Sequence, residues 1–212
     1  MKFSAAVFNL DGTVIDSEWA WGQSLKNVLR SLGVNEKRKY PQVGGIGVSA
    51  NWKILKEKYG LKGISIEGLT SKTFGEFIKL IPQIKLMRGL ERFVHGLKKK
   101  KIKLALATST DRHIVEKVFE ALPIKKHFRV ISTGEEVGNR KPAPDLFLLA
   151  AYKLKTDPSK CLVFEDAESG VVAARAAGMK VIAIARDKEY AKLLKDADMV
   201  VKNFEEISFN QD

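Results

Sequence analysis

The chain has 212 residues, of which 45% are hydrophobic and 29% are charged, and its formal net charge is +12. This composition is typical of a soluble globular protein with one core, or with a core domain and a smaller second domain. The sequence has no apolar run of 18 residues, which excludes a membrane-spanning helix, and its basic residues lack a recognition motif, so we expect neither a membrane partner nor a specific nucleic acid.

The first predicted element is a buried strand that ends in two polar residues. Ala5 to Phe8 is apolar, and Asn9, Asp11 and Gly12 follow at once. Side chains alternate along a strand, so those of Asn9 and Asp11 should leave the strand end in the same direction, while Gly12 lets the backbone turn beside them. Two oxygen-bearing groups at such a turn suit a hard cation and a phosphate.

Residues 17–84 are predicted to form a small helical bundle inserted after this strand. The first helix is indicated by apolar residues at helical spacing, with Gly33 at its end: Trp21, Leu25, Val28, Leu29 and Leu32. A loop at 41–47 should precede a second helix, capped by Ser49 and ended by Gly60, and a third helix should stop before Pro82. The stretch contains no convincing period-2 strand pattern.

From about Met87 the sequence alternates between helix and strand patterns. Strands are predicted at 102–107, 129–132, 161–164, 181–185 and 199–201. Helices are predicted at 90–97, 114–122, 145–154, 169–177 and 189–195. Repeated strand–helix units predict an α/β fold with a doubly wound parallel sheet covered on both faces, and in such sheets the ligand lies beyond the carboxyl ends of the strands.

Further polar residues follow these predicted strands, at Thr108, Ser109, Lys141, Glu165 and Asp166. The rule for parallel sheets predicts that they converge with Asn9 and Asp11 on one crevice. A Thr at a strand end is commonplace, and the Asp111 that follows has the character of a helix N-cap. The Lys-Pro-x-Pro-Asp context of Lys141 is more distinctive, because Pro142 restrains the backbone next to the charge.

The segment Asn9-Leu10-Asp11-Gly12-Thr13 resembles the Asp-x-Asp-Gly-Thr signature of haloacid dehalogenase-like (HAD) phosphohydrolases, and the match extends over nearly the whole chain. The resemblance implies a HAD-like, Rossmann-type core at 1–16 and 85–212 with an inserted α-helical cap domain at 17–84. The family's first Asp is the nucleophile that takes the phosphoryl group, and here it is replaced by Asn9. The Asp11 side chain would be the general acid and base of the family mechanism.

The same resemblance assigns the phosphate and metal ligands. Thr108 and Ser109 would bind phosphate oxygens through a hydroxyl and backbone N–H groups, and Lys141 would neutralise the phosphate. A Mg²⁺ cofactor would be held by the side chain of position 9, the backbone carbonyl of Asp11 and the side chain of Asp166, with Glu165 either bonded to the ion or next to its ligands.

Within the family, the cap selects the substrate. The nearest patterns are those of sugar-phosphate phosphatases and β-phosphoglucomutase, which share the Asp16-Ser17-Glu18 style of transition into the cap. Mutases carry a His shortly afterwards and a Gly-Val-Ser-Arg loop, and here the corresponding residues are Trp21 and Ala50. We therefore favour a phosphatase of a small phosphorylated metabolite over a mutase. We expect the cap to move against the sheet domain, with hinges near Asp16 and Lys85.

Three interpretations of Asn9 stay open. The chain is an engineered trap in which the nucleophilic Asp was replaced, a natural phosphate-binding protein without catalysis, or an enzyme in which another group supplies the nucleophile. The sequence offers no good candidate for such a group. We favour the first interpretation, because Asp-to-Asn is the smallest change that silences such a site.

Two further expectations concern location and charge. Met1-Lys2-Phe3-Ser4 leads directly into the first strand without room for a signal peptide, and Cys161 is the only cysteine, so we expect a cytoplasmic protein, and a monomer. The basic cluster from Lys98 to Lys103 precedes a strand and follows a helix pattern, and we interpret it as a solvated helix end. A basic surface also attracts phosphorylated metabolites in general.

Overall fold

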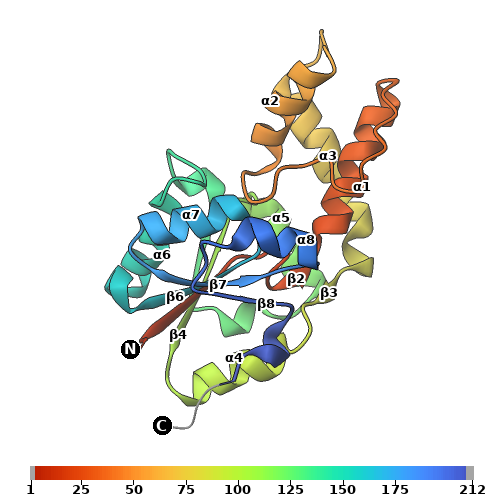
Figure 1. The fold of residues 1–212 in the computed structure, drawn as a ribbon. Coiled ribbons are helices and arrows are strands. Elements are labelled where there is room, and N and C mark those ends of the chain that lie inside the picture. The colour runs from red at the N-terminus through yellow and green to blue at the C-terminus, as the bar shows by residue number, and fades with distance from the viewer. Residues whose placement is uncertain (1–2, 209–212) are drawn as a thin grey trace.

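The computed structural model describes residues 3–208, and its centre is a parallel β-sheet (Figure 1). Within these residues, the strands of this sheet are β1 (Ala5–Phe8), β4 (Lys103–Thr108), β5 (Val130–Thr133), β6 (Cys161–Glu165), β7 (Lys180–Ile184) and β8 (Met199–Val201). Their order is β5-β4-β1-β6-β7-β8, and every neighbouring pair is parallel. The predicted α/β class and parallel sheet are confirmed.

Strand β1 lies at the middle of the sheet because all four of its residues are apolar and buried. It pairs with β4 on one side, where Phe8 lies opposite Leu106, and with β6 on the other, where Phe8 lies opposite Phe164. The rings of Phe8 and Phe164 stack with their centroids 4.6 Å apart. Its neighbour Val7 faces the other side of the sheet, in a separate apolar cluster, as the period of a strand requires.

Helices cover both faces of the sheet. The apolar residues of α4 (Leu90–Lys99) and α5 (Arg112–Ala121) belong to the cluster of Phe8, and those of α6 (Asp145–Leu154) and α7 (Glu168–Ala176) belong to the cluster of Val7. The short helix α8 (Lys188–Ala191) follows β7. Short 3₁₀ turns lie at Ile81–Gln83, Lys125–His127, Gly134–Glu136, Pro158–Lys160, Lys192–Leu194 and Phe204–Glu206.

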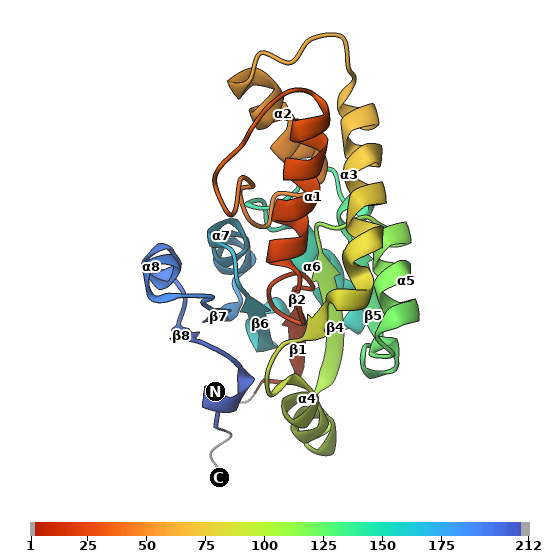
Figure 2. The same cartoon turned by 90° about the vertical axis from the view of Figure 1, so that its right-hand side faces the viewer.

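The chain between β2 (Ile15–Asp16) and β3 (Lys85–Leu86) is helical. Residues 17–84, all of which the structure describes, contain no strand and form α1 (Glu18–Ser31), α2 (Val48–Lys58) and α3 (Ile66–Leu80). These helices share an apolar cluster of their own, made of Leu25, Val28, Leu29, Trp52, Leu55 and Leu69. Figure 2 shows the three helices together at the top of the view, with the sheet below them. That they form a separate, moving cap domain stays a prediction.

Both connections to this helical segment lie side by side. Strands β2 and β3 form an antiparallel ribbon in which Asp16 pairs with Lys85 and Ile15 pairs with Leu86. The two positions that we expected to act as hinges are therefore hydrogen-bonded neighbours.

Of the two predicted helix N-caps, Ser49 was wrong, and Asp111 holds the N-cap position without a capping bond from its side chain. The N-cap of α2 is Gly47, with a φ of 85°, and Ser49 lies inside the first turn. Asp111 does precede α5, but its side chain makes no capping hydrogen bond, and its Oδ1 instead accepts one from Arg140. The first N–H of α5, that of Arg112, donates to a Glu135 carboxylate. A glycine turn thus takes the place of Ser49 at α2, and a carboxylate from elsewhere in the chain bonds the first N–H of α5.

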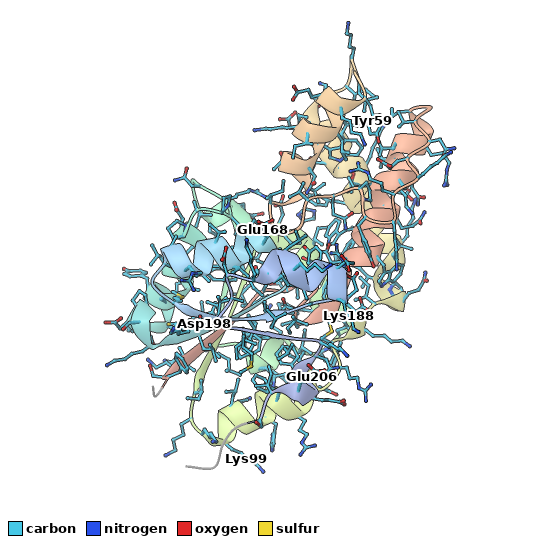
Figure 3. The ribbon with its side chains drawn as sticks, viewed as in Figure 1. Tyr59, Lys99, Glu168, Lys188, Asp198 and Glu206 are labelled. Carbon is cyan, nitrogen blue, oxygen red and sulfur yellow. The ribbon has the colours of Figure 1, made fainter. Side chains whose placement is uncertain are left out.

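Lys98 and Lys99 of the basic cluster form the exposed C-terminal end of α4, as predicted, whereas Lys103 begins β4 and is partly buried. Figure 3 shows Lys99 of this cluster at the end of the molecule opposite to Tyr59, which marks the tip of the helical segment. Within the described residues, no helix is both long and apolar enough to cross a membrane. Met1 and Lys2, which belong to the predicted leaderless start, lie outside the described residues, as do 209–212.

Candidate active site

The candidate residues meet at the carboxyl ends of three neighbouring strands. Asn9 follows β1, Thr108 ends β4 and Glu165 ends β6, and the strand order places β1 between the other two. The group is almost fully enclosed: the exposed fraction is 5% for Asn9, 1% for Thr108, 2% for Lys141, 0% for Glu165 and 5% for Asp166. The structure thus brings together residues that are up to 157 positions apart in the sequence.

Asn9 lies at the centre of the group and contacts three of its members. Its amide Nδ2 donates to the backbone carbonyl of Asp11 at 2.8 Å and to Asp166 Oδ1 at 3.0 Å. Its Oδ1 accepts a hydrogen bond from Lys141 Nζ at 3.2 Å. These contacts fix the orientation of the amide, because a reversed amide would point N–H groups at the ammonium of Lys141.

Asp166 is held beside a glycine that no other residue can replace without strain. Thr13 donates to its Oδ1 at 3.2 Å. Gly12 has a φ of +70°, and a Cβ built there would lie 2.1 Å from Asp166 Oδ2. Burial, and then the negative charge of Glu165, raises the pKa of Asp166 well above its usual value.

The oxygen atoms expected to hold magnesium are only partly suited to it as they stand. The carbonyl of Asp11 and Oδ1 of Asp166 converge on one point, which fits a hard cation. The Nδ2 amide group of Asn9 occupies that point, and it donates a hydrogen bond to each of the two oxygens that a cation would bind. Magnesium would therefore require the amide to turn so that its oxygen faces the ion. Among the described residues, no group of three or more His, Cys, Asp and Glu side chains is arranged to bind a metal.

Glu165 forms a buried ion pair with Lys141, and both side chains are fully enclosed. Its other oxygen, Oε2, accepts hydrogen bonds from the backbone N–H groups of Asp166 at 2.7 Å and Ala167 at 2.9 Å. Both carboxylate oxygens are thus engaged, so these contacts do not support the prediction that Glu165 is a metal ligand. The carboxylate instead positions Lys141 and the loop that carries Asp166.

The carboxylate of Asp11 is anchored by three donors. Oδ1 accepts hydrogen bonds from the Ser17 hydroxyl and from Trp21 Nε1, both at 2.7 Å, and Oδ2 accepts one from the Thr110 hydroxyl at 2.6 Å. The Trp21 ring stacks on Phe77 of α3, with centroids 3.6 Å apart. As a residue of the site, Trp21 was marked by the sequence only as a departure from a mutase His. The structure gives it a positive role, because an indole can donate to Asp11 but cannot accept a proton from it.

The two residues predicted to bind phosphate are oriented differently. Thr108 Oγ1 accepts a hydrogen bond from the Thr110 N–H at 3.1 Å, so its own O–H is the group that can donate to a phosphate oxygen. The Ser109 hydroxyl donates to the carbonyl of Gly45 at 2.6 Å. Because that hydroxyl is engaged, the group of Ser109 that this conformation leaves for a phosphate oxygen is its backbone N–H.

A loop of the helical segment closes over the group. The Gly44 carbonyl accepts a hydrogen bond from the Ser169 hydroxyl at 2.9 Å, and the Gly45 carbonyl accepts the one from Ser109. Asn51 shapes the loop from within, since its side chain bonds both backbone groups of Val43. Beneath the loop lies a cavity that encloses about 480 Å³, including its open mouth.

This arrangement can be compared with known proteins. A family model described as haloacid dehalogenase-like hydrolase matches residues 6–184. A bifunctional riboflavin kinase/FMN phosphatase of Arabidopsis thaliana is 34% identical over 207 residues, which cover 96% of this chain and 54% of that protein. The chain thus spans about half the length of that relative.

Two further relatives match over most of both chains. A phosphorylated carbohydrates phosphatase of Thermotoga maritima is 32% identical, with 84% of this chain and 83% of the relative covered. The crystal structure of an aspartate-to-asparagine mutant of CbbY from Rhodobacter sphaeroides, in complex with xylulose 1,5-bisphosphate, superimposes with a TM-score of 0.81 at 26% identity, and covers 97% of this chain and 96% of that one. From the family match over residues 6–184 and the fold, the chain belongs to the haloacid dehalogenase-like hydrolases.

Proposed function

We propose that this chain has the site of a magnesium-dependent phosphatase of a small phosphorylated metabolite, and that Asn9 silences its hydrolytic step. The observation that carries the proposal is the position of Asn9. Its side chain lies between Lys141 and Asp166, where a carboxylate would have a phosphate-neutralising cation on one side and the expected metal ligands on the other. A carboxylate at this position would add the negative charge that the amide lacks.

The other residues have roles that their contacts support. Lys141 and the Thr108 hydroxyl would neutralise and orient the phosphate. Asp11, whose carboxylate is held in one orientation by three donors, would protonate the leaving alcohol and later accept a proton from water. Magnesium, when bound at the Asp11 carbonyl, Asp166 and the side chain of position 9, would supply additional neutralisation of the phosphate charge.

Position 9 is the group that would attack phosphorus. A carboxylate there forms a covalent aspartyl-phosphate, which water then hydrolyses. The neutral amide of Asn9 is a far weaker nucleophile, and its phosphorylation has no productive next step. Asp11 would not replace it, because its carboxylate is the proposed acid and base for the leaving alcohol and the attacking water. The chain would therefore bind a phosphomonoester and leave it intact.

The relatives support this direction. The Arabidopsis and Thermotoga proteins are named as phosphatases of FMN and of phosphorylated carbohydrates. The CbbY complex supports the idea that a HAD protein with an aspartate-to-asparagine change retains a phosphorylated sugar. A mutase function is less well supported, because Trp21 stands where mutases carry a proton-shuttling His.

The test is a phosphate-release screen over sugar, glycolate and nucleotide phosphates, run on this chain and on Asn9→Asp. We expect Asn9→Asp to gain magnesium-dependent activity of roughly a millionfold, the loss typical when a catalytic nucleophile is removed. On that background, Lys141→Ala and Asp166→Ala should each abolish the activity. Asn203→Asp, which adds the same charge at a distant turn where Asn203 already caps a backbone N–H, should stay inactive.

One outcome would favour a different function. If Asn9→Asp binds the same ligands but releases no phosphate from any ester, the chain is a non-catalytic phosphometabolite-binding protein.

A further inference from the structure

The loop at the end of β4 is held by the guanidinium of Arg140. Nη1 of Arg140 donates a hydrogen bond to the backbone carbonyl of Ser109 at 3.1 Å, and Nη2 donates a longer one to Asp111 Oδ1 at 3.4 Å. One acceptor belongs to the main chain, and the other belongs to a side chain two residues further on. The guanidinium therefore bridges residues 108–111, which we call the 108–111 loop, at two points.

The 108–111 loop carries groups on which the proposed chemistry depends. The Thr108 hydroxyl and the Ser109 N–H are the groups that this conformation leaves for phosphate oxygens. The Thr110 hydroxyl of the same loop donates to Asp11 Oδ2 at 2.6 Å. A shift of this loop would therefore displace both phosphate donors and one anchor of the Asp11 carboxylate at the same time.

Arg140 and its main-chain acceptor lie against glycines that leave them little room to move. A Cβ built on Gly47 would lie 2.6 Å from Arg140 Nη1, and a Cβ built on Gly134 would lie 2.7 Å from the carbonyl oxygen of Ser109. The Arg140 side chain is 30% exposed, and the described residues that line the cavity do not include it. The guanidinium therefore contacts the loop from outside the cavity lining.

From these contacts we propose that Arg140 is a positioning residue, which sets the conformation of the 108–111 loop and, through this loop, the affinity of the site for phosphate. The proposal rests on the proposed function, since it concerns how that same site is held. The role depends on shape as well as charge. A planar guanidinium can donate to two separate acceptors in fixed directions, whereas the donors of a lysine ammonium all radiate from one atom.

Asp111 distinguishes positioning from direct attraction of the phosphate by Arg140. If Arg140 attracted the phosphate directly, the Asp111 carboxylate would oppose that attraction, and Asp111→Asn would tighten phosphate binding. If Arg140 holds the loop, Asp111→Asn loosens one of its two anchors and weakens phosphate binding. The Asp111 side chain makes no capping hydrogen bond to α5, so the variant removes no bond from the start of that helix.

The experiment measures the binding of inorganic phosphate by isothermal titration calorimetry with magnesium, on this chain and its variants. We expect Arg140→Ala and Arg140→Lys each to lower the phosphate affinity about tenfold, and Asp111→Asn to lower it severalfold. Arg175→Ala is the matched control. Arg175 is exposed and outside the cavity lining, and its guanidinium also donates to a backbone carbonyl at 3.1 Å, that of Asp196, so its loss should leave the affinity unchanged.

A second measurement reports on the loop without any ligand. Hydrogen–deuterium exchange followed by mass spectrometry should be severalfold faster in peptides that cover the 108–111 loop of Arg140→Ala and Arg140→Lys than in those of Arg175→Ala. Exchange in β1 should be the same in all three variants, which shows that the sheet is intact.

Three results would each overturn the proposal: unchanged exchange of the loop in Arg140→Ala, full phosphate affinity in Arg140→Lys, or tighter phosphate binding in Asp111→Asn. Phosphate binding by this chain that Arg140→Ala leaves unchanged overturns this proposal alone. If inorganic phosphate does not bind to this chain and Asn9→Asp shows no turnover, the proposed function fails and this proposal fails with it.

Discussion

The buried pair of Lys141 and Glu165 makes a sharp prediction about stability. Glu165→Gln keeps the shape of the side chain but removes its charge. The amide oxygen can still accept from the backbone N–H groups of Asp166 and Ala167, as Oε2 does now. The amide nitrogen would then face the ammonium of Lys141, so two donors would oppose each other and the ammonium would lose its counter-charge.

The expected loss follows from the burial. Both side chains have no exposed surface, so the ammonium of Lys141 would be left as a buried charge without a counter-charge. Removing one partner from such a pair costs about 3–5 kcal/mol, a large part of the roughly 5–15 kcal/mol that holds a typical domain folded. Urea unfolding monitored by far-UV circular dichroism, extrapolated to water, measures the difference.

Two further variants make the measurement decisive. Glu189→Gln removes a carboxylate from an ion pair with Lys192, whose side chains are 70% and 82% exposed, and should cost less than about 1 kcal/mol. Adding Lys141→Met to Glu165→Gln should recover part of the lost stability, because it removes the unpaired charge. If Glu165→Gln costs no more than Glu189→Gln, or if the double variant is the least stable, Lys141 does not depend on Glu165.

Three other predictions concern the same region. Asn9→Asp should bind magnesium more tightly than the present chain in calorimetric titration, since it restores a charged oxygen and removes the N–H donor; equal affinities would show that position 9 is not a ligand. Glu18→Gln should stabilise the protein on the order of 3 kcal/mol at pH 8 and not at pH 4. Burial raises the pKa of Glu18 from 4.5 to about 7, so the stability that is present below pH 4.5 is lost as the pH rises to 7. Urea midpoints at the two pH values test this, and an equal gain at both would refute it. Gly12→Ala should displace the carboxylate of Asp166 and weaken magnesium binding. Gly33→Ala is the control, because Gly33 has a φ of +79° and no atom within 4 Å of an added Cβ, so that variant imposes similar backbone strain alone. Equal magnesium affinities in the two variants would contradict the close approach of Gly12 to Asp166.

The fold could be predicted because its signals are local. The run Ala5 to Phe8 is apolar and ends in a polar turn, and it forms β1 with those bounds. The helix predicted at 145–154 is α6 with the same ends, since Pro144 precedes it and its apolar spacing continues to Leu154. The convergence of Asn9, Lys141 and Asp166 also followed from one general rule about strand ends, applied without any knowledge of their contacts.

The contacts within the site could not be predicted in the same way. Trp21 and Thr110 bond Asp11 from two different elements, and their approach depends on how the helical segment sits on the sheet. The Ser109 hydroxyl turns to Gly45 for the same reason. Glu165 gave an acidic signal that fits a metal site or an ion pair equally well, and only the position of Lys141 distinguishes them.

The β2–β3 ribbon makes the helical segment a replaceable part. The chain leaves the sheet at Asp16 and returns at Lys85, and paired antiparallel residues lie about 5 Å apart. Any insert whose ends are that close could therefore be joined to the same two strands without moving the sheet or the residues at its strand ends. One contact limits this freedom. Trp21 comes from the insert and bonds Asp11, so a substitute insert would have to supply its own donor to that carboxylate.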